Sequence, residues 1–390
     1  MRTDGVEIVG WGHTPFGKLG DESLESLIVA AAQEALVSAG LSGSEIDEVY
    51  LGTFNAGMQP IGFPSSLTLE ADDGLIFAPA TRVENACATG SAAIAQGLRA
   101  ILSGAARRVL VVGAEKMTGA GRDVIGRALL SADYERAGEA TLSGFAELFA
   151  VVAGAYSRKY GDAGEAMARV AAKNHRNGVA NPYAQLRSDL GFEFCNTVGP
   201  HNPMVAAPLR RTDCSPVSDG AAAVVLAATG SAGGSPAVRI RAAAQANDFL
   251  PGNKRDPLAF AASHVAWDRA MADAGLTLSD LGLVEVHDCF TIAELIEYEV
   301  IGLCPPGGGA RVIEEGIVDK TGSLPVNPSG GLKAKGHPVG ATGVSQHVMA
   351  AMQLTGTAGA MQIPGVTTAG VFNMGGMAVA NYASILERIR

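Results

Sequence analysis

The feature that most constrains the fold is a pattern that this chain shows twice. In the first half, a helical pattern ending at Gly40 leads through an acidic turn into the strand-like run 48–54. In the second half, a helical pattern ending at Gly275 leads into the strand-like run 284–290. Both glycines stand where a helix ends, and glycine enters the left-handed conformation needed there at the least cost. The repetition predicts two related α/β halves, about 235 to 250 residues out of register.

Length and composition agree with two halves. A chain of 390 residues exceeds the size at which a single core keeps growing. We expect an N-terminal half over residues 1–230 and a C-terminal half over 238–390, joined by the Gly- and Ser-rich segment 228–237. Residues 116–206 break the repeated pattern and are predicted to be an insertion that covers the functional site. The run 221–227 then returns as a buried strand.

Three short segments carry residues suited to acyl transfer. Cys87 follows an apolar run and precedes a helix, whose free N–H groups favour a thiolate and can hold an oxyanion. His287 and Cys289 lie at the end of a second-half strand, and His337 lies in a Gly-rich turn. A lone Cys among alanines is more often a buried apolar residue, so the prediction depends on the combination.

The repeat also predicts that these segments meet. Cys87 is followed three residues later by Gly90, and His337 by Gly340, and both turns precede a helix. In α/β folds, ligands bind at strand ends. We therefore expect Cys87, Cys289 and His337 to share one site near a pseudo-two-fold axis.

These residues resemble the thiolases, and in particular the sterol-carrier-protein type with a His-Asp-Cys-Phe box. The specific matches are residues 85–91, 287–290 and 330–338, with weaker ones at 173–175 and 213–220. The resemblance extends over nearly the whole chain. It implies a duplicated α/β fold, with two βαβαβαββ halves in a five-layered α-β-α-β-α arrangement and an inserted loop domain.

The resemblance also implies roles for the residues. Cys87 would take up the acyl group, and His337 would accept its proton and then help to bind the thioester oxygen. Most thiolases have a second catalytic Cys where this chain has Phe372. Phenylalanine cannot move a proton, so Cys289 would serve instead, and His287 would lie near the oxyanion.

The substrates implied are acyl-CoA thioesters, with no further cofactor and no metal. Backbone N–H groups of Cys87 and of the loop near Met374 would form a second oxyanion hole. The residues that contact coenzyme A are not identified. The locally basic segment 169–211 is either a candidate for its phosphates or an ordinary solvated helix face. The resemblance further implies a homodimer or dimer of dimers, and some relatives bind a small OB-fold protein.

Composition excludes other classes of function. A net charge of −10 argues against nucleic acid as a partner. No window approaches 18 uninterrupted apolar residues, so no membrane span is expected. The N-terminus lacks a secretory pattern, and five scattered cysteines without zinc-type spacing indicate a reducing cytoplasm.

Three other functions stay open. The first is transfer of the acyl group to a carbon nucleophile other than an acyl-CoA, the second is a thiolase-like retro-aldolase, and the third is a lipid-binding relative without activity. His175 and Asp288 are left unassigned. The remaining cysteines and several histidines are interpreted as structural or surface residues: Cys195, Cys214, Cys304, His13, His264 and His347.

Overall fold

The strands of the two halves form one nine-stranded sheet in the computed structural model, which describes residues 3, 5–141, 143–231 and 237–389. The strand order is β3-β2-β4-β7-β1-β8-β11-β10-β9. The strands are β1 (Val6–His13), β2 (Glu48–Gly52), β3 (Ala80–Val83), β4 (Arg108–Glu115), β7 (Gly220–Ala228), β8 (Val238–Asn247), β9 (Leu283–Glu285), β10 (Thr368–Gly375) and β11 (Ala380–Arg388). A separate hairpin consists of β5 (Met204–Ala206) and β6 (Leu209–Arg210).

This strand order shows the duplication directly. Outward from the antiparallel contact between β1 and β8, each half continues in the same sequence: β7-β4-β2 in the first and β11-β10-β9 in the second. The first half ends in β3. In the described C-terminal half, the corresponding strand is reduced to a single bridge between Val284 and Val326. The two halves therefore match in topology and differ at their outer edges.

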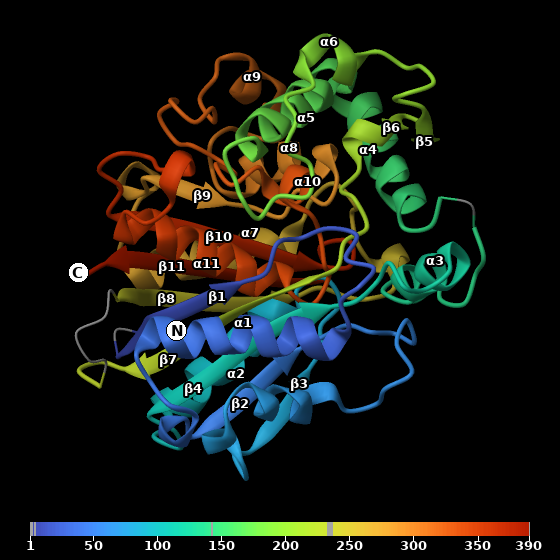
Figure 1. Cartoon of the computed structure of the whole chain (residues 1–390). Coiled ribbons are helices and arrows are strands. Elements are labelled where there is room, and N and C mark those ends of the chain that lie inside the picture. Colours follow the sequence, from blue (N-terminus) through green and yellow to red (C-terminus); the bar gives the residue numbers. More distant parts are fainter. Residues whose placement is uncertain (1–2, 4, 142, 232–236, 390) are drawn as a thin grey trace.

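Helices divide the molecule into five layers (Figure 1). Helix α1 (Leu24–Ala39) covers the outer face of the first-half strands, and α7 (Ala261–Ala274) covers β8 and β11. Helices α2 (Thr89–Leu102) and α11 (Thr342–Thr355) pack against each other between the two sets of strands. The five-layered α/β arrangement predicted from the resemblance is confirmed.

The predicted helix ends are also confirmed. Gly40 and Gly275 end α1 and α7 with φ angles of 64° and 66°, in the left-handed region. The strand predicted over 284–290 is too long, because β9 ends at Glu285. The Asn327 side chain accepts the N–H of Val286 at 2.9 Å, which takes this N–H from the strand ladder. Residues 286–290 therefore form a loop that carries the His-Asp-Cys-Phe box.

The insertion is mainly helical and packs over one end of the sheet (Figure 1). Helix α5 (Gly164–Gly178) ends in a polar stretch of the sequence. Its polar residues Asn174, His175 and Asn177 are buried.

Strand β7 ends at Ala228 and β8 begins at Val238; within the predicted link, residues 232–236 lie outside the described residues. The domain boundaries therefore stay a prediction. The other helices are α3 (Arg122–Leu130), α4 (Ala146–Tyr160), α5 (Gly164–Gly178), α6 (Gly191–Asn196), α8 (Thr291–Val300), α9 (Gly309–Glu314) and α10 (Gly331–Lys335).

Candidate active site

Cys87 lies in a tight turn between β3 and α2. Ala86, just before it, has a φ of 48°, a conformation that a residue with a side chain adopts only when its surroundings hold it. Thr89 holds this turn, because its Oγ1 donates to the Ala86 carbonyl at 2.6 Å and accepts the Asn85 N–H at 2.8 Å. The Cys87 side chain is 8% exposed, so its sulfur opens only onto an interior space.

Burial controls the charge of this thiol. It raises the pKa of Cys87 to about 12, although hydrogen bonds from the backbone N–H groups of Gly376 and of Cys87 itself act in the opposite direction. We expected the helix N-terminus to stabilise a thiolate. That expectation is wrong, because desolvation outweighs the N–H contacts. Cys87 is therefore a neutral thiol.

His337 is held as a neutral base. Its backbone N–H donates to Ser218 Oγ at 3.0 Å, and its Nδ1 lies 2.6 Å from Thr342 Oγ1. The Thr342 hydroxyl donates its only hydrogen to the Pro338 carbonyl, so it accepts the hydrogen on His337 Nδ1. The lone pair is then on Nε2. Burial and the nearby Lys335 cation lower the pKa of His337 to about 3.

His287 has the opposite tautomer. The Asn373 amide nitrogen donates to His287 Nδ1 at 2.8 Å and also to the Cys87 carbonyl at 3.2 Å. The hydrogen of this neutral ring is therefore on Nε2. That Nε2 is buried and has no hydrogen-bond partner among the described residues. Burial, followed by the charge of His337, lowers the pKa of His287 well below its usual value. His287 thus offers an N–H donor where His337 offers an acceptor.

The structure brings these residues together. Side-chain donor atoms of Cys87, His287 and His337 all lie within 4.8 Å of one another, and the two imidazole rings meet edge to face at 5.1 Å. A sulfur and two imidazoles are also ligand types that zinc accepts. With a hydrogen on His287 Nε2, however, only two of the three atoms are free to bind a metal. The arrangement fits a nucleophile, a base and a hydrogen-bond donor.

Cys289 opens onto the same cavity as Cys87 and His337. The cavity measures about 350 Å³ and has a mostly apolar lining, to which the insertion contributes Ile125, Leu129 and Phe145. Burial, and then the charge of Cys87, raise the pKa of Cys289 well above its usual value. Phe372 is fully buried in the core, so it presents no polar group to this cavity. Three of the four predicted residues therefore line one space, which the insertion helps to enclose, and His287 lies behind it beside Cys87 and His337.

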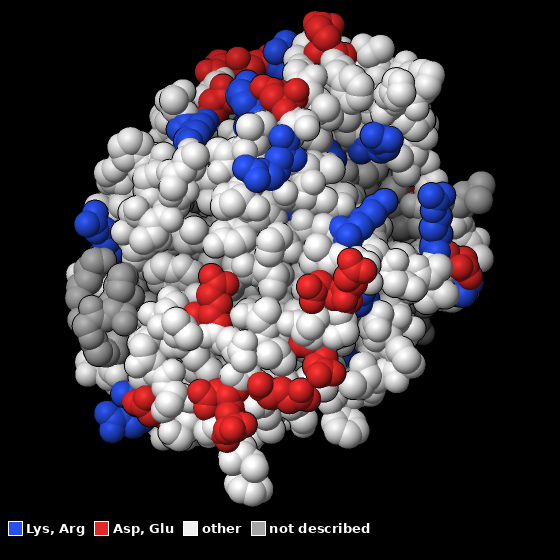
Figure 2. All heavy atoms as spheres, viewed as in Figure 1, with Lys and Arg blue, Asp and Glu red and all other residues white. Residues whose placement is uncertain are grey.

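Cys214, interpreted as structural, also lines this cavity, and its Sγ donates to the Arg210 carbonyl at 3.5 Å. The prediction for the basic segment needs correction at two cations. Two cations of the basic segment are buried in ion pairs: Lys173 with Glu294 at 2.8 Å, and Arg210 with Asp213 at 2.7 Å. They are therefore committed to the interior and are not free to bind phosphates. The face in Figure 2 carries acidic side chains over its lower part and shows no continuous basic track.

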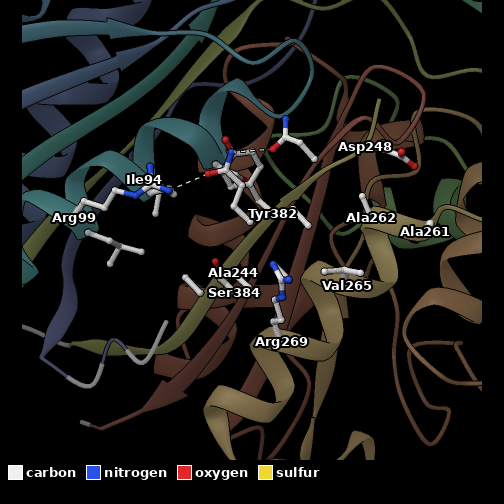
Figure 3. A pocket seen from close by; sticks show the side chains of 18 residues that line it. Ile94, Arg99, Ala244, Asp248, Ala261, Ala262, Val265, Arg269, Tyr382 and Ser384 are labelled. Carbon is white, nitrogen blue, oxygen red and sulfur yellow. Dashed lines mark hydrogen bonds between the residues drawn. The ribbon is translucent and has the colours of Figure 1, made fainter. Parts of the chain in front are cut away.

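A larger groove of about 660 Å³ lies elsewhere, between α2, β8, β11 and α7 (Figure 3). Arg99 and Arg269 flank it, and the Arg99 guanidinium donates to Gln245. No cysteine or histidine stands among the described residues that line this groove. Size alone therefore does not locate the chemistry, and the smaller cavity is the candidate active site.

Sequence reasoning missed the residues that orient the reactive groups. Asn373 fixes His287, Thr342 fixes His337, and Ser218 holds the His337 backbone. Glu115 accepts the N–H groups of Phe54, Asn55 and Gly340, each at 2.9 Å. In the sequence, Glu115 is only an acidic residue at the end of an apolar strand, and Asn373 is only an amide residue in a glycine-rich run. Neither pattern predicts which residues these side chains contact.

The starts of the two central helices correct the predicted correspondence between turns. Ala88-Thr89-Gly90 and Ala341-Thr342-Gly343 begin helices of 14 residues each. Cys87 is therefore equivalent to Gly340, and not to His337 as we expected. The two helix starts touch, since a Cβ added to Gly90 would lie 2.9 Å from the Gly340 carbonyl. The site lies where the halves meet.

Comparisons with known proteins identify the class. The family model for the thiolase N-terminal domain matches residues 6–230, and the thiolase C-terminal domain-like model matches residues 244–388. This chain belongs to the thiolase family.

Among its relatives, the chain is 37% identical over 377 residues to an acetyl-CoA acetyltransferase of Methanothermobacter thermautotrophicus, covering 95% of this chain and 96% of the relative. It is 32% identical to human sterol carrier protein 2, covering 95% and 70% of the two chains.

Solved structures agree on the fold. The structure of an Ltp2-ChsH2(DUF35) aldolase superposes with a TM-score of 0.82 at 24% identity, covering 99% of this chain and 98% of that one. Human mitochondrial 3-ketoacyl-CoA thiolase in complex with CoA gives a TM-score of 0.72 at 20% identity, with the same coverage. Within the described residues, no helix is both long and apolar enough to cross a membrane.

Proposed function

We propose that this protein is a thiolase-type acyltransferase that forms or cleaves a carbon–carbon bond between acyl-CoA units through an acyl group on Cys87. The observation that carries the proposal is the group of Cys87, His287 and His337 within 4.8 Å, beside a cavity that also contains Cys289. The relatives named acetyl-CoA acetyltransferase support acetyl-CoA as the first substrate to test.

In the first half-reaction, His337 Nε2 accepts the proton of Cys87 as the sulfur attacks the thioester carbonyl. The backbone N–H groups of Cys87 and Gly376 support a negative oxygen beside the sulfur, as their effect on the pKa of Cys87 indicates. Collapse of the intermediate expels coenzyme A thiolate, which takes up the proton from His337. Cys87 is left as a thioester.

In the second half-reaction, a second acyl-CoA enters the same cavity. The His287 Nε2–H, which lacks a protein partner, donates to its thioester oxygen and stabilises the enolate that forms. Cys289 removes the proton from the carbon next to that thioester. The carbon then attacks acyl-Cys87, the new carbon–carbon bond forms as the Cys87 thioester bond breaks, and Cys289 returns the proton that it removed to the released Cys87 thiolate. The raised pKa of Cys289 favours the protonated thiol, so its thiolate, once formed, is a strong base.

Mass spectrometry after incubation with acetyl-CoA tests this assignment. The wild-type protein should gain one acetyl group on Cys87, and Cys87→Ala should gain none. Cys289→Ala should still be acetylated but should lose carbon–carbon bond formation and the exchange of acetyl-CoA methyl protons with deuterated solvent. Equal acetylation of wild type and Cys87→Ala would contradict the nucleophile. Full condensation by Cys289→Ala would move the proton-transfer role to another residue, of which His287 is the nearest candidate.

The same experiment separates the other functions considered. A retro-aldolase or a lipid-binding relative would not form the acyl-enzyme. A transferase to another carbon acceptor would form it but would not condense it with acyl-CoA. The presence of both thiols in one cavity favours the thiolase reaction.

We further propose that the protein acts in the cytoplasm as a homodimer or a dimer of dimers. A complex with a small OB-fold protein is a second possibility that the family resemblance suggests. Light scattering of the purified chain tests the first proposal, which a monomer at micromolar concentration would refute. Co-purification with a co-expressed OB-fold protein tests the second.

A further inference from the structure

The carboxylate of Asp288 joins the two segments that carry the proposed catalytic groups of the C-terminal half. Asp288 stands between the two reactive residues of the His-Asp-Cys-Phe box and is fully buried. Its Oδ1 accepts the backbone N–H of Leu332 at 2.6 Å, and its Oδ2 accepts that of Lys333 at 3.0 Å. Both donors belong to α10, which ends two residues before His337. One side chain therefore spans from the box to the start of the His337 turn.

The contact between the two segments is close. Gly331 has a φ of 58°, and a Cβ at this position would overlap both oxygens of the Asp288 carboxylate. Only a residue without a side chain lets α10 lie directly against the carboxylate. The distance between the two segments is therefore set by direct contact and by two hydrogen bonds.

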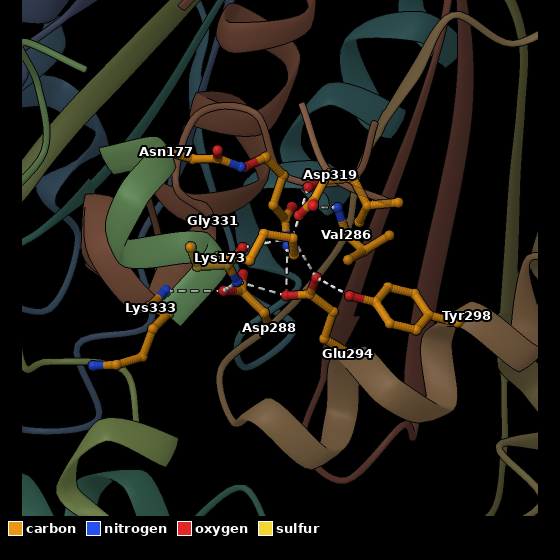
Figure 4. Close-up of polar contacts among 12 residues, drawn as sticks. Lys173, Asn177, Val286, Asp288, Glu294, Tyr298, Asp319, Gly331 and Lys333 are labelled. Atoms are coloured by element: carbon orange, nitrogen blue, oxygen red, sulfur yellow. Dashed lines mark hydrogen bonds and ion pairs between the residues drawn. The ribbon is translucent and has the colours of Figure 1, made fainter. Parts of the chain in front are cut away.

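A buried polar network holds Asp288 from the other side (Figure 4). The Asn174 amide nitrogen donates to Asp288 Oδ2 at 2.7 Å and to Glu294 Oε2 at 2.6 Å. Glu294 in turn pairs with Lys173 and accepts the Tyr298 hydroxyl at 2.6 Å. Burial, followed by the Glu294 charge, raises the pKa of Asp288 to about 7, while the N–H groups of Leu332 and Lys333 act against this rise. The partners in this network come from α5 and α8, so together with α10 the Asp288 carboxylate is fixed to three elements.

We propose that Asp288 is a positioning residue that aligns His287 and Cys289 with His337 around Cys87. It does not touch the reacting atoms and acts through the backbone that presents them. A misplacement of about 1 Å in a reacting geometry can cost about 100-fold in rate, whereas substrate binding by the cavity walls is less affected. The inference rests on the proposed function, because its main readout is acylation of Cys87.

Asp288→Asn is the direct test, because it keeps the shape of the side chain but replaces one carboxylate oxygen by an NH₂ group. This NH₂ group would face another N–H donor, either a backbone N–H of α10 or the Asn174 amide. Acylation of Cys87 at saturating acetyl-CoA should fall about 10- to 100-fold, with KM within about twofold of wild type. Alkylation of Cys87 by iodoacetamide, which needs no thioester substrate, should also slow. Gly331→Ala disturbs the same contact from α10 and should give the same pattern.

Tyr298→Phe is the matched control. It removes the hydrogen bond to Glu294 from the same buried network and keeps both hydrogen bonds between Asp288 and α10. It should lower the unfolding midpoint while leaving both rates within about twofold of wild type.

Wild-type rates in Asp288→Asn would overturn the proposal. It would also be overturned if Tyr298→Phe slowed both reactions as much as Asp288→Asn at equal loss of stability, because the role would then be structural only. If Asp288→Asn does not fold, Gly331→Ala replaces it in the same comparison with Tyr298→Phe. If the wild-type protein does not acylate at all, the proposed function fails, and the iodoacetamide rates still decide the role of Asp288.

Discussion

The N-termini of α2 and α11, at the centre of the molecule, have the same backbone arrangement but carry different candidate reactive residues. In the first half, Thr89 bonds to its own turn and Cys87 stands two residues before it. In the second half, Gly340 occupies the place of Cys87, and Thr342 uses its hydroxyl to hold the imidazole of His337. The repeated backbone thus supplies the geometry, while the proposed nucleophile and the proposed base come from different copies.

The strands beside these helices differ in the same manner. Strand β4 pairs with its parallel neighbour β2 as far as Gly113, and β10 pairs with its parallel neighbour β9 as far as Val371. Two residues beyond these positions, each strand carries a polar side chain: Glu115 in β4 and Asn373 in β10. Glu115 accepts backbone N–H groups and holds loops in place. Asn373 instead donates to the His287 ring. One position stabilises the fold and its counterpart orients a reactive group.

The largest expected effect comes from removing the base. His337→Ala should slow acylation of Cys87 by about 10²- to 10⁴-fold, because a buried neutral thiol then has no nearby acceptor for its proton. Rapid-quench mass spectrometry with acetyl-CoA measures this rate, and circular dichroism checks the fold. A wild-type rate would mean that His337 is structural and that the two copies do not share the chemistry.

Removing Glu115 should mainly cost stability. Glu115→Ala leaves three buried N–H groups without an acceptor, and each unpaired group costs about 1–3 kcal/mol. We expect the free energy of unfolding to fall by about 3 kcal/mol or more in urea titrations. Asn373→Ala, at the counterpart position, should instead lose more activity than stability. The contrast between the two positions would be wrong if both variants lost activity and stability in the same proportion.

A smaller difference should separate the two threonines. Thr342→Val removes the acceptor that fixes the tautomer of His337, and acylation should slow by about tenfold. Thr89→Val removes hydrogen bonds within the turn before α2 and should lower stability by about 1 kcal/mol, with a weaker effect on the rate. The two variants need parallel measurement of acylation and unfolding. Equal rate losses would remove the distinction between the two turns.

The smallest effect is expected from pH. The pKa of His337 is lowered to about 3, so it stays an unprotonated base as pH falls, until pH approaches that value. The pKa of Cys87 is raised to about 12, so the thiol does not ionise as pH rises through neutrality. In Asp288→Asn, which removes the carboxyl group whose pKa is about 7, kcat/KM for acylation should therefore be flat between pH 5 and 8. An acidic limb near the ordinary histidine value of about 6.5 in this variant would show that one of the imidazoles is solvated.

Local patterns were enough to predict much of this molecule. Gly40 and Gly275 marked helix ends because a single residue type satisfies that backbone conformation. Cys87, His287, Cys289 and His337 were selected by their strand-end and turn positions. Cys87, Cys289 and His337 line one cavity, and His287 lies beside Cys87 and His337. Their catalytic roles stay predictions that the experiments above test.

The remaining features depend on contacts between distant residues. The thiolate expectation for Cys87 neglected desolvation, which exists only once both halves enclose the thiol. The expected equivalence between Cys87 and His337 was wrong because the two turns were aligned by the spacing to Gly90 and Gly340. The helix starts at Thr89 and Thr342 give the correct alignment. Asn373 and Asp288 gained their roles from partners that no local spacing identifies.

The packing of α2 against α11 also sets when reactivity can arise. Cys87 is synthesised in the first quarter of the chain and His337 in the last, and contacts between such distant residues form late because closing a long loop costs entropy. The proposed acyl transfer from Cys87 with His337 as the base therefore requires that both copies have assembled.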